Sequence, residues 1–351
     1  MTRIAIDAMG GDHAPHEIIA GAVWAASEYN VGLQLVGKQD QIEQVLDQIE
    51  QEGIYSDCGK GGRKKRIKID IKKLDIKITH ASEIIEMGEA PGQAIRKKKK
   101  SSIVLAVDAV AKGESDAIVA AGSTGAAMAS SLFGLGRIPG IERPAIAVTL
   151  PTMKKPIVVI DAGANSSCTP QMLKQFAIMG YTFSKNVLGV DKPRVGVLNI
   201  GEEAGKGNEL AQNTYKLLEE SQEDLNFIGN IEGREIFLNV CDIVVCDGFV
   251  GNVALKITEG TSSMLFRMIK NEFKSDLIGI IIGLLAKPVM KRIYEKINYE
   301  EFGGALLLGV KGITVISHGR SKAYAIKNAV RVAKDAVETG VNKKIAEFVE
   351  G

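Results

Sequence analysis

Residues 241–256 read CDIVVCDGFVGNVALK, in which the apolar run Ile243–Cys246 stops abruptly at Asp247-Gly248 and helical spacing follows. Continuous apolar runs without alternation are typical of strands buried on both faces, as in a parallel sheet covered by helices. Five more segments share this organisation: Ile4–Ile6 before DAMGGDHAP (7–15), Ala117–Ala121 before GSTG (122–125), Ile157–Ile160 before DAGANS (161–166), Val195–Leu198 before NIGEEAGKGNE (199–209) and Phe227-Ile228 before GNIEGRE (229–235). The repeated pattern predicts a doubly wound α/β fold.

The polar, glycine-rich clusters that follow these strands predict a binding site. In parallel sheets the carboxyl ends of the strands lie along one edge, where ligands bind. Glycine allows close approach of backbone to a ligand, and free amides at helix starts favour anions. We therefore expect the clusters to converge on one polar, anion-accepting site.

The bulk composition excludes several classes of function. The chain has 351 residues, is 45% hydrophobic and carries a net charge of only +2, so no global field indicates nucleic acid. Its four cysteines form no disulfide or zinc pattern, and no HExxH, G-x-G-x-x-G or Walker sequence occurs. The amino terminus enters a strand directly and shows no secretory signal, which favours a cytoplasmic location.

Two stretches interrupt the strand–helix rhythm. Residues 53–77 contain GKGGRKKR followed by alternating Ile67, Ile69 and Ile71, which predicts a basic loop leading into an exposed edge strand. Residues 259–302 contain ten apolar or small residues (277–286), too few to span a membrane, and then a basic amphipathic segment. The second stretch is interpreted as a helical arm that contacts a membrane interface, a second subunit or both.

The remaining polar residues form an inventory for holding phosphate. Lys206 lies in a glycine-flanked turn, Asn252 and Lys256 follow the DGF sequence, and Ser123 and Thr124 supply hydroxyls. The basic run 96–100 (RKKKK), which precedes a predicted helix start, belongs to the same inventory. Three of these features also have a purely structural interpretation: Lys206 as a solvated loop lysine, Asn252 as a helix N-cap, and the basic run as a solvated face. Asp7 and Asp161, at strand ends, either cap turns or orient cationic donors.

These motifs, in this order, resemble one family over nearly the whole chain. DAMGGDHAP, GSTGA, DAGAN, the 201–208 loop, FIGN, DGFVGNVALK and the late FGGA (302–305) are similar to those of the acyl-acyl-carrier-protein:phosphate acyltransferases of bacterial phospholipid synthesis. The resemblance implies a single Rossmann-like α/β/α domain over residues 1–351, similar to phosphate acetyltransferases and isopropylmalate-dehydrogenase-like proteins. It also implies a homodimer with a membrane-contacting helical arm.

The resemblance implies transfer of a long-chain acyl group from acyl carrier protein to inorganic phosphate, with Lys206 and Asn252 as the catalytic residues. The expected substrate- and phosphate-binding set is Asp7, Gly10, Gly11, Asp12, Ser123, Thr124, Gly125, Asp161, Asn165, Asn199, Gly201, Gly207, Asp247, Gly248, Gly251 and Lys256. Ser123 departs from the family, which usually has Asn there, and the basic stretch at 53–77 is longer than usual.

Carrier proteins are acidic, so docking is expected on basic surfaces. The candidates are Arg63–Arg66, the run containing Arg96, Lys97 and Lys98, and the arm segment containing Lys287, Lys291 and Arg292. Neither a cofactor nor a metal is expected, because hydrogen phosphate is a competent nucleophile and a thiol with a pKa near ~8.5 is a competent leaving group. The alternatives are a short-chain enzyme that uses coenzyme A thioesters and a non-catalytic peripheral membrane scaffold.

Overall fold

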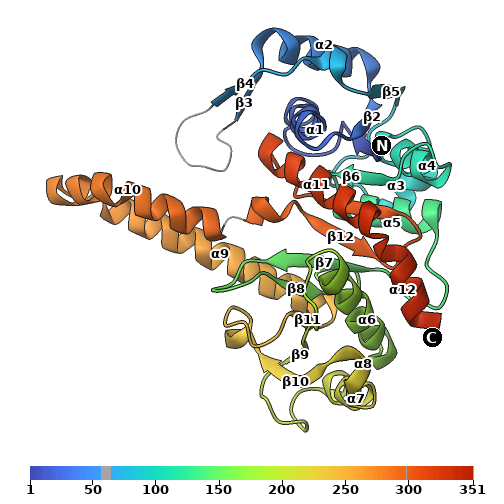
Figure 1. Cartoon of the computed structure of the whole chain (residues 1–351), viewed down its shortest axis with the longest axis vertical. Helices are drawn as coiled ribbons and strands as arrows, with labels where there is room; N and C mark the ends of the chain where they lie inside the picture. Colours follow the sequence, from blue (N-terminus) through green and yellow to red (C-terminus); the bar gives the residue numbers. More distant parts are fainter. Residues whose placement is uncertain (57–64, 298, 351) are drawn as a thin grey trace.

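The protein is described here by a computed structural model covering residues 1–56, 65–297 and 299–350 (Figure 1). The helices are α1 (His16–Tyr29), α2 (Gln39–Glu52), α3 (Pro91–Lys97), α4 (Ser102–Ala111), α5 (Thr124–Leu135), α6 (Pro170–Asn186), α7 (Glu209–Glu219), α8 (Gln222–Leu225), α9 (Gly248–Glu272), α10 (Leu277–Ile297), α11 (Ala323–Thr339) and α12 (Val341–Glu350). The strands are β1 (Arg3–Asp7), β2 (Gly32–Gly37), β3 (Ile54–Ser56), β4 (Lys65–Ile67), β5 (Ile76–His80), β6 (Ala117–Ala120), β7 (Ala145–Leu150), β8 (Ile157–Ile160), β9 (Val195–Asn199), β10 (Phe227–Glu232), β11 (Ile243–Val245), β12 (Ala305–Leu308) and β13 (Ile313–Ile316).

Within the described residues, eleven strands form one sheet in the order β10-β9-β11-β8-β7-β12-β13-β6-β1-β2-β5. Seven neighbouring pairs are parallel and three, all involving β7 or β12, are antiparallel. The strands on both sides of the centre are continuous apolar runs, and those of β6, β8 and β11 are fully buried. The predicted mostly parallel α/β sheet is therefore confirmed.

The antiparallel pairs reverse the direction of the sheet at its centre. Three successive reversals separate β8 from β13, so β8, β9, β10 and β11 run opposite to β13, β6, β1, β2 and β5. The carboxyl ends of these two groups therefore leave the sheet at opposite edges. The expectation that all six polar clusters lie along one edge is wrong for this reason.

Helices cover both faces of the sheet. One core cluster packs α1, α6, α11 and α12 on one face, with fully buried Ile19, Phe176 and Val330. A second cluster lies under α3, α4 and α5 on the other face, and Leu255 of α9 packs against it. Burial on both faces explains the absence of alternation in the strand sequences.

The stretch 53–77 differs from its prediction. β3 and β4 form a separate antiparallel ribbon, and the edge strand of the main sheet is β5, paired with β2. β4 ends at Ile67. Ile69 is only 7% exposed and packs into the core, so the predicted exposed strand does not continue through Ile69 and Ile71. The tip of the basic loop, including Arg63, lies outside the described residues.

The stretch predicted as an arm contains the outer part of α9 and α10, which project from the body as a pair of helices (Figure 1). Phe266 of α9 and Tyr294 of α10 meet edge to face at 5.8 Å between ring centroids. Gly283 allows close packing, because a Cβ there would lie 2.9 Å from the Cβ of Phe273. No helix among the described residues is long and apolar enough to cross a membrane.

Candidate active site

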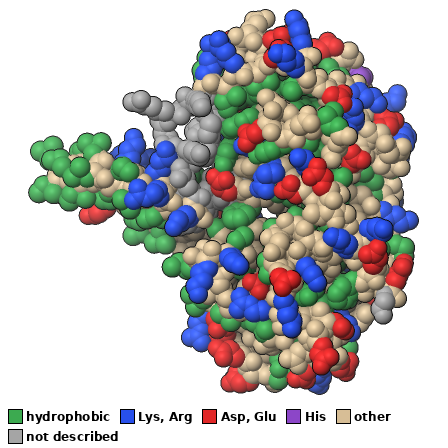
Figure 2. Space-filling view, in the orientation of Figure 1, with side chains coloured by type: hydrophobic (Ala, Val, Ile, Leu, Met, Phe, Trp, Pro, Cys, Tyr) green, Lys and Arg blue, Asp and Glu red, His purple; other side chains and the backbone are tan. Residues whose placement is uncertain are grey.

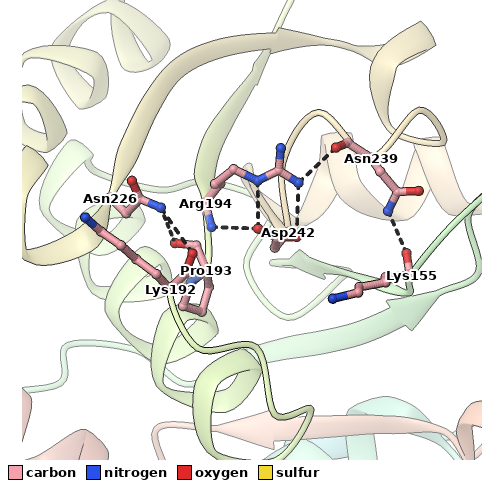
Figure 3. Close-up of polar contacts among 7 residues, drawn as sticks. All are labelled: Lys155, Lys192, Pro193, Arg194, Asn226, Asn239 and Asp242. Atoms are coloured by element: carbon pink, nitrogen blue, oxygen red, sulfur yellow. Dashed lines mark hydrogen bonds and ion pairs between the residues drawn. The ribbon is translucent and has the colours of Figure 1, made fainter.

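Three polar segments follow the adjacent, parallel strands β8, β11 and β9 and form what we call the Lys206 edge: the loops 161–165 and 199–208, and the start of α9 with its cap, 247–252. The strands that carry them are tied together at their other ends (Figure 3). The guanidinium of Arg194 donates from Nε to Asp242 (2.9 Å) and from its terminal nitrogen to the carbonyl of Asn239 (2.9 Å), and Asn239 donates to the carbonyl of Lys155 (2.8 Å). The partner carboxylate raises the pKa of Arg194, so the tie stays charged.

Lys206 projects from a rigid loop. Asn199 donates to the carbonyl of Lys206 (3.1 Å), and Gln212 donates to the carbonyls of Gly205 (2.9 Å) and Gly207 (3.1 Å). Gly207 has a φ of +87°, which favours glycine. The loop backbone is therefore fixed while the lysine side chain is exposed, with no ion pair or hydrogen bond to any residue that the structure describes.

Asn230 gives the loop a further brace that its sequence position did not predict. Its amide donates to the carbonyl of Glu203 (2.9 Å), while its Oδ1 is buried and has no partner. Neither Asn230 nor Gln212 stood among the predicted site residues. The FIGN motif that contains Asn230 was the available signal, and Gln212 carried none.

The 161–165 loop is built around the carboxylate of Asp161. That carboxylate accepts hydrogen bonds from the backbone N–H groups of Ile146, Gly163, Ala164 and Asn165 and from the Asn165 side chain, at 2.7–3.2 Å. Burial raises the pKa of Asp161, and these donors oppose the rise. Asp161 is 0% exposed and shapes the loop, which favours the turn-capping alternative over a direct contact with phosphate.

The first turns of α9 pack directly on this loop. The carboxylate of Asp247 caps the helix by accepting from the N–H groups of Phe249 and Val250, each at 3.0 Å. Gly248 and Gly251 permit the approach, since a Cβ at Gly248 would lie 2.7 Å from the Asn165 carbonyl, and one at Gly251 would collide with the Asp161 carbonyl. These glycines are packing residues that set the position of the helix start.

Asn252 is not the N-cap, because Asp247 holds that position, and its carboxamide is exposed one turn into α9. It lies beside Gly163, where an added Cβ would be 3.6 Å from the Asn252 Nδ2. The structure gives the carboxamide no hydrogen bond among the described residues. Lys256, one turn further, pairs with Glu259 at 3.0 Å and is therefore already engaged.

The remaining predicted residues form a second set, the Asp7 edge, at the carboxyl ends of β1, β6 and β13 (7–12, 122–125 and 317–321). Gly10 lies against Gly122, and the N–H of Asp12 donates to the Gly319 carbonyl (2.8 Å). Ser123 caps α5 by accepting from the Ala126 N–H (3.3 Å), Gly125 abuts Pro91, and Thr124 is exposed. Asp12 is exposed, and the N-cap position of α1 is Pro15, with no side-chain cap.

Asp7 is only 4% exposed, and burial raises its pKa while hydrogen bonds from Ser102 and the Met9 N–H lower it. The cavity beside it has a volume of about 10 Å³, enough for a single water. The Asp7 edge is thus closed and interlocked. The described residues include no cluster of three or more side chains able to hold a metal.

The chemistry available at the Lys206 edge follows from its geometry. The Lys206 ammonium extends from the loop after β9 and the Asn252 carboxamide from the first turns of α9, which follows the neighbouring strand β11. Neither group has a hydrogen-bond partner among the described residues. Such donors can hold an anion and stabilise a developing oxyanion without reorganisation.

Comparison with known proteins identifies the family of the chain. The family described as "Fatty acid synthesis protein" matches residues 2–56 and 62–344. The chain is 47% identical to a phosphate acyltransferase of Dictyoglomus turgidum over 98% of this chain and 97% of the relative. It is 49% identical to a phosphate acyltransferase of Heliobacterium modesticaldum over 99% and 98%.

A phosphotransacetylase from Streptococcus pyogenes has the same fold, with a TM-score of 0.62 at 14% identity over 96% of this chain and 94% of that one. The fold and family suggested by the motifs are thereby confirmed. By its family match and its near full-length similarity to these relatives, the chain belongs to the phosphate acyltransferase family.

Proposed function

We propose that the protein transfers a long-chain fatty acyl group from acyl carrier protein to inorganic phosphate, forming an acyl-phosphate for phospholipid synthesis. The observation that carries the proposal is the pair of uncommitted polar side chains on the Lys206 edge, in a chain of this family. The arm supports the long-chain product, because an amphiphilic acyl-phosphate needs a surface that short-chain products do not.

In the proposed mechanism, Lys206 and backbone amides of the 199–208 loop hold hydrogen phosphate beside the thioester carbonyl. Asn252 donates to the carbonyl oxygen as it becomes an oxyanion, a contact of a kind worth about 3–4 kcal/mol in other enzymes. Phosphate oxygen attacks the carbonyl carbon, the tetrahedral intermediate collapses, and the carbon–sulfur bond breaks to release the pantetheine thiolate. The two side chains could exchange these roles without changing the balance of the reaction.

The other predicted residues take supporting places in this proposal. Asn165, Asn199, Gly201, Gly207, Asp247, Gly248 and Gly251 shape the Lys206 edge. Gly10, Gly11, Ser123, Thr124 and Gly125 belong to the Asp7 edge and keep a direct phosphate role only if substrate bridges the two edges.

We further propose that the protein is a cytoplasmic homodimer that touches the membrane peripherally through its arm. The tip of the arm is hydrophobic and the cations lie nearer the body (Figure 2). Leu277 and Leu285 are 79% and 76% exposed, and Lys287 and Arg292 are also exposed. A face of this kind requires cover by lipid or by a second subunit.

The deciding experiment is to measure acyl-phosphate, trapped with hydroxylamine, from palmitoyl-carrier protein and phosphate, beside palmitoyl- and acetyl-coenzyme A. A strong preference for the carrier thioester is expected. Product from acetyl-coenzyme A alone would indicate the short-chain reaction instead, and no product from any donor would leave only a scaffold role.

A further inference from the structure

A groove that encloses about 340 Å³ lies between α3, α4 and α5. This volume is within the range of sites that accommodate small ligands or large side chains. Its walls are apolar and its rim is charged; the lining residues are Ile95, Arg96, Lys99, Val104, Val107, Asp108, Ser130, Phe133 and Gly134.

The floor of the groove contains a polar group without a partner. Ser130 is 4% exposed, and its hydroxyl makes no hydrogen bond. The oxygen itself is shielded from solvent, so the groove surface beside it is apolar. Gly134 keeps α4 and α5 close, since a Cβ at that position would lie 2.5 Å from Cγ1 of Val107.

The rim combines an exposed aromatic ring with uncompensated cations. Phe133 is 67% exposed, and Arg96 and Lys99 are exposed with no ion pair or hydrogen bond within the described parts of the chain. Lys98 differs from them: its ammonium pairs with Glu89 at 2.5 Å and donates to the Ile84 carbonyl at 2.8 Å. Among the predicted docking cations, Lys98 is therefore already paired within the chain.

The only acid lining the groove is Asp108, on the α4 side, so the two sides differ in charge. Arg96, Lys97, Lys99 and Lys100 are all exposed on the α3 side. An aromatic anchor next to Arg in a groove is characteristic of protein-binding hot spots, and a groove flanked by cations suits an amphipathic acidic helix.

We propose that this groove is the docking site for the acidic acyl carrier protein. An apolar side chain of the carrier enters the groove beside Phe133 and Val107, and carrier carboxylates face Arg96 and Lys99. The inference rests on the proposed function and assigns carrier docking to this surface, leaving the cations of the arm for the membrane.

The test uses a labelled holo-carrier protein titrated at low salt against the full chain. Arg96→Glu combined with Lys99→Glu, and separately Phe133→Ala, should each raise the dissociation constant by about tenfold. The KM for acyl-carrier protein should rise by a similar factor while kcat at saturation stays within about twofold. All three side chains are exposed, so the variants should fold; circular dichroism checks this.

Lys192→Glu is the control, an exposed lysine shortly before β9, in the other half of the sheet, with the same kind of charge reversal. Unchanged binding in the groove variants, or an equal loss in the control, would overturn the inference. Loss of carrier binding in the arm variant Lys287→Glu with Arg292→Glu would also overturn the inference. Loss of binding to anionic vesicles in the groove variants, with carrier binding retained, would overturn it as well. Because the titration needs no turnover, it reads docking even if acyl transfer to phosphate were absent.

Discussion

The two polar edges of the sheet have the same sequence signature and different structures. Each is built from glycine-rich loops after buried strands, yet the Lys206 edge presents an exposed ammonium and carboxamide, whereas the Asp7 edge is closed around a buried carboxylate. At the Lys206 edge, hydrogen bonds fix the backbone and leave the functional groups available. The comparison teaches that glycine-rich clusters indicate close packing at strand ends, and only the uncommitted side chains distinguish a reactive site from a structural one.

The largest effect should come from Lys206→Ala. Loss of the ammonium should lower kcat/KM for acyl transfer to phosphate by about 10³-fold, roughly 4 kcal/mol, because the phosphate loses its positioning charge. The melting temperature should not change, since the side chain is exposed. Lys216→Ala, an exposed lysine on the helix that follows, is the control and should retain full activity. Normal turnover by Lys206→Ala would remove this residue from the mechanism.

The next largest effect should come from Asn252→Ala, which should lower kcat by about 10²-fold because one oxyanion donor is lost. Single-turnover measurements separate this effect from binding of the thioester. Asn271→Ala changes an exposed residue of the same type on the same helix and should act like the parent protein. Equal activity in the two variants would show that Asn252 has no special role.

At the Asp7 edge the comparison predicts a loss of stability and no direct loss of chemistry. A Cβ on Gly10 would lie 2.6 Å from the Asp7 carboxylate and 2.9 Å from the Gly122 nitrogen. Gly10→Ala should therefore lower the free energy of unfolding by about 1–3 kcal/mol, measured by denaturant titration. Gly88→Ala, where a Cβ meets nothing within 4 Å, is the control. A large fall in kcat for the folded Gly10→Ala protein would mean that this edge joins the reaction.

The smallest effect should be the pH dependence contributed by Asp7. Its pKa is raised above the ordinary value of 3.8, so the native state holds the proton more tightly than the unfolded state, and stability falls as the pH rises from 3.8 through the folded-state pKa. Asp7→Asn removes this fall, so its melting temperature should gain on that of the parent over this pH window. A constant difference at all pH values would contradict the argument.

Much of this organisation was readable from the sequence, for identifiable reasons. Fully buried strands such as β8 and β11 must be continuous apolar runs, and Gly or Asp must follow where chains pack closely. The reversal of the sheet was not readable, because β7 and β12 have the same apolar composition as their parallel neighbours and strand patterns carry no direction. The division of roles depended on distant contacts as well: Asp161 is occupied by five donors, and Lys98 by Glu89, which no local pattern indicates.

The helix α9 is continuous over 25 residues, from Gly248 at the Lys206 edge to Glu272 far out on the arm. At 1.5 Å per residue it is a rod of roughly 37 Å. Its first turns are clamped, because Gly251 leaves no space between the helix and the Asp161 carbonyl. Asn252 and the outer part of the arm therefore belong to one continuous helix, which is held near its start by the 161–165 loop. Any tilt that a surface imposes on the tip must be absorbed by bending of the helix or reach the carboxamide.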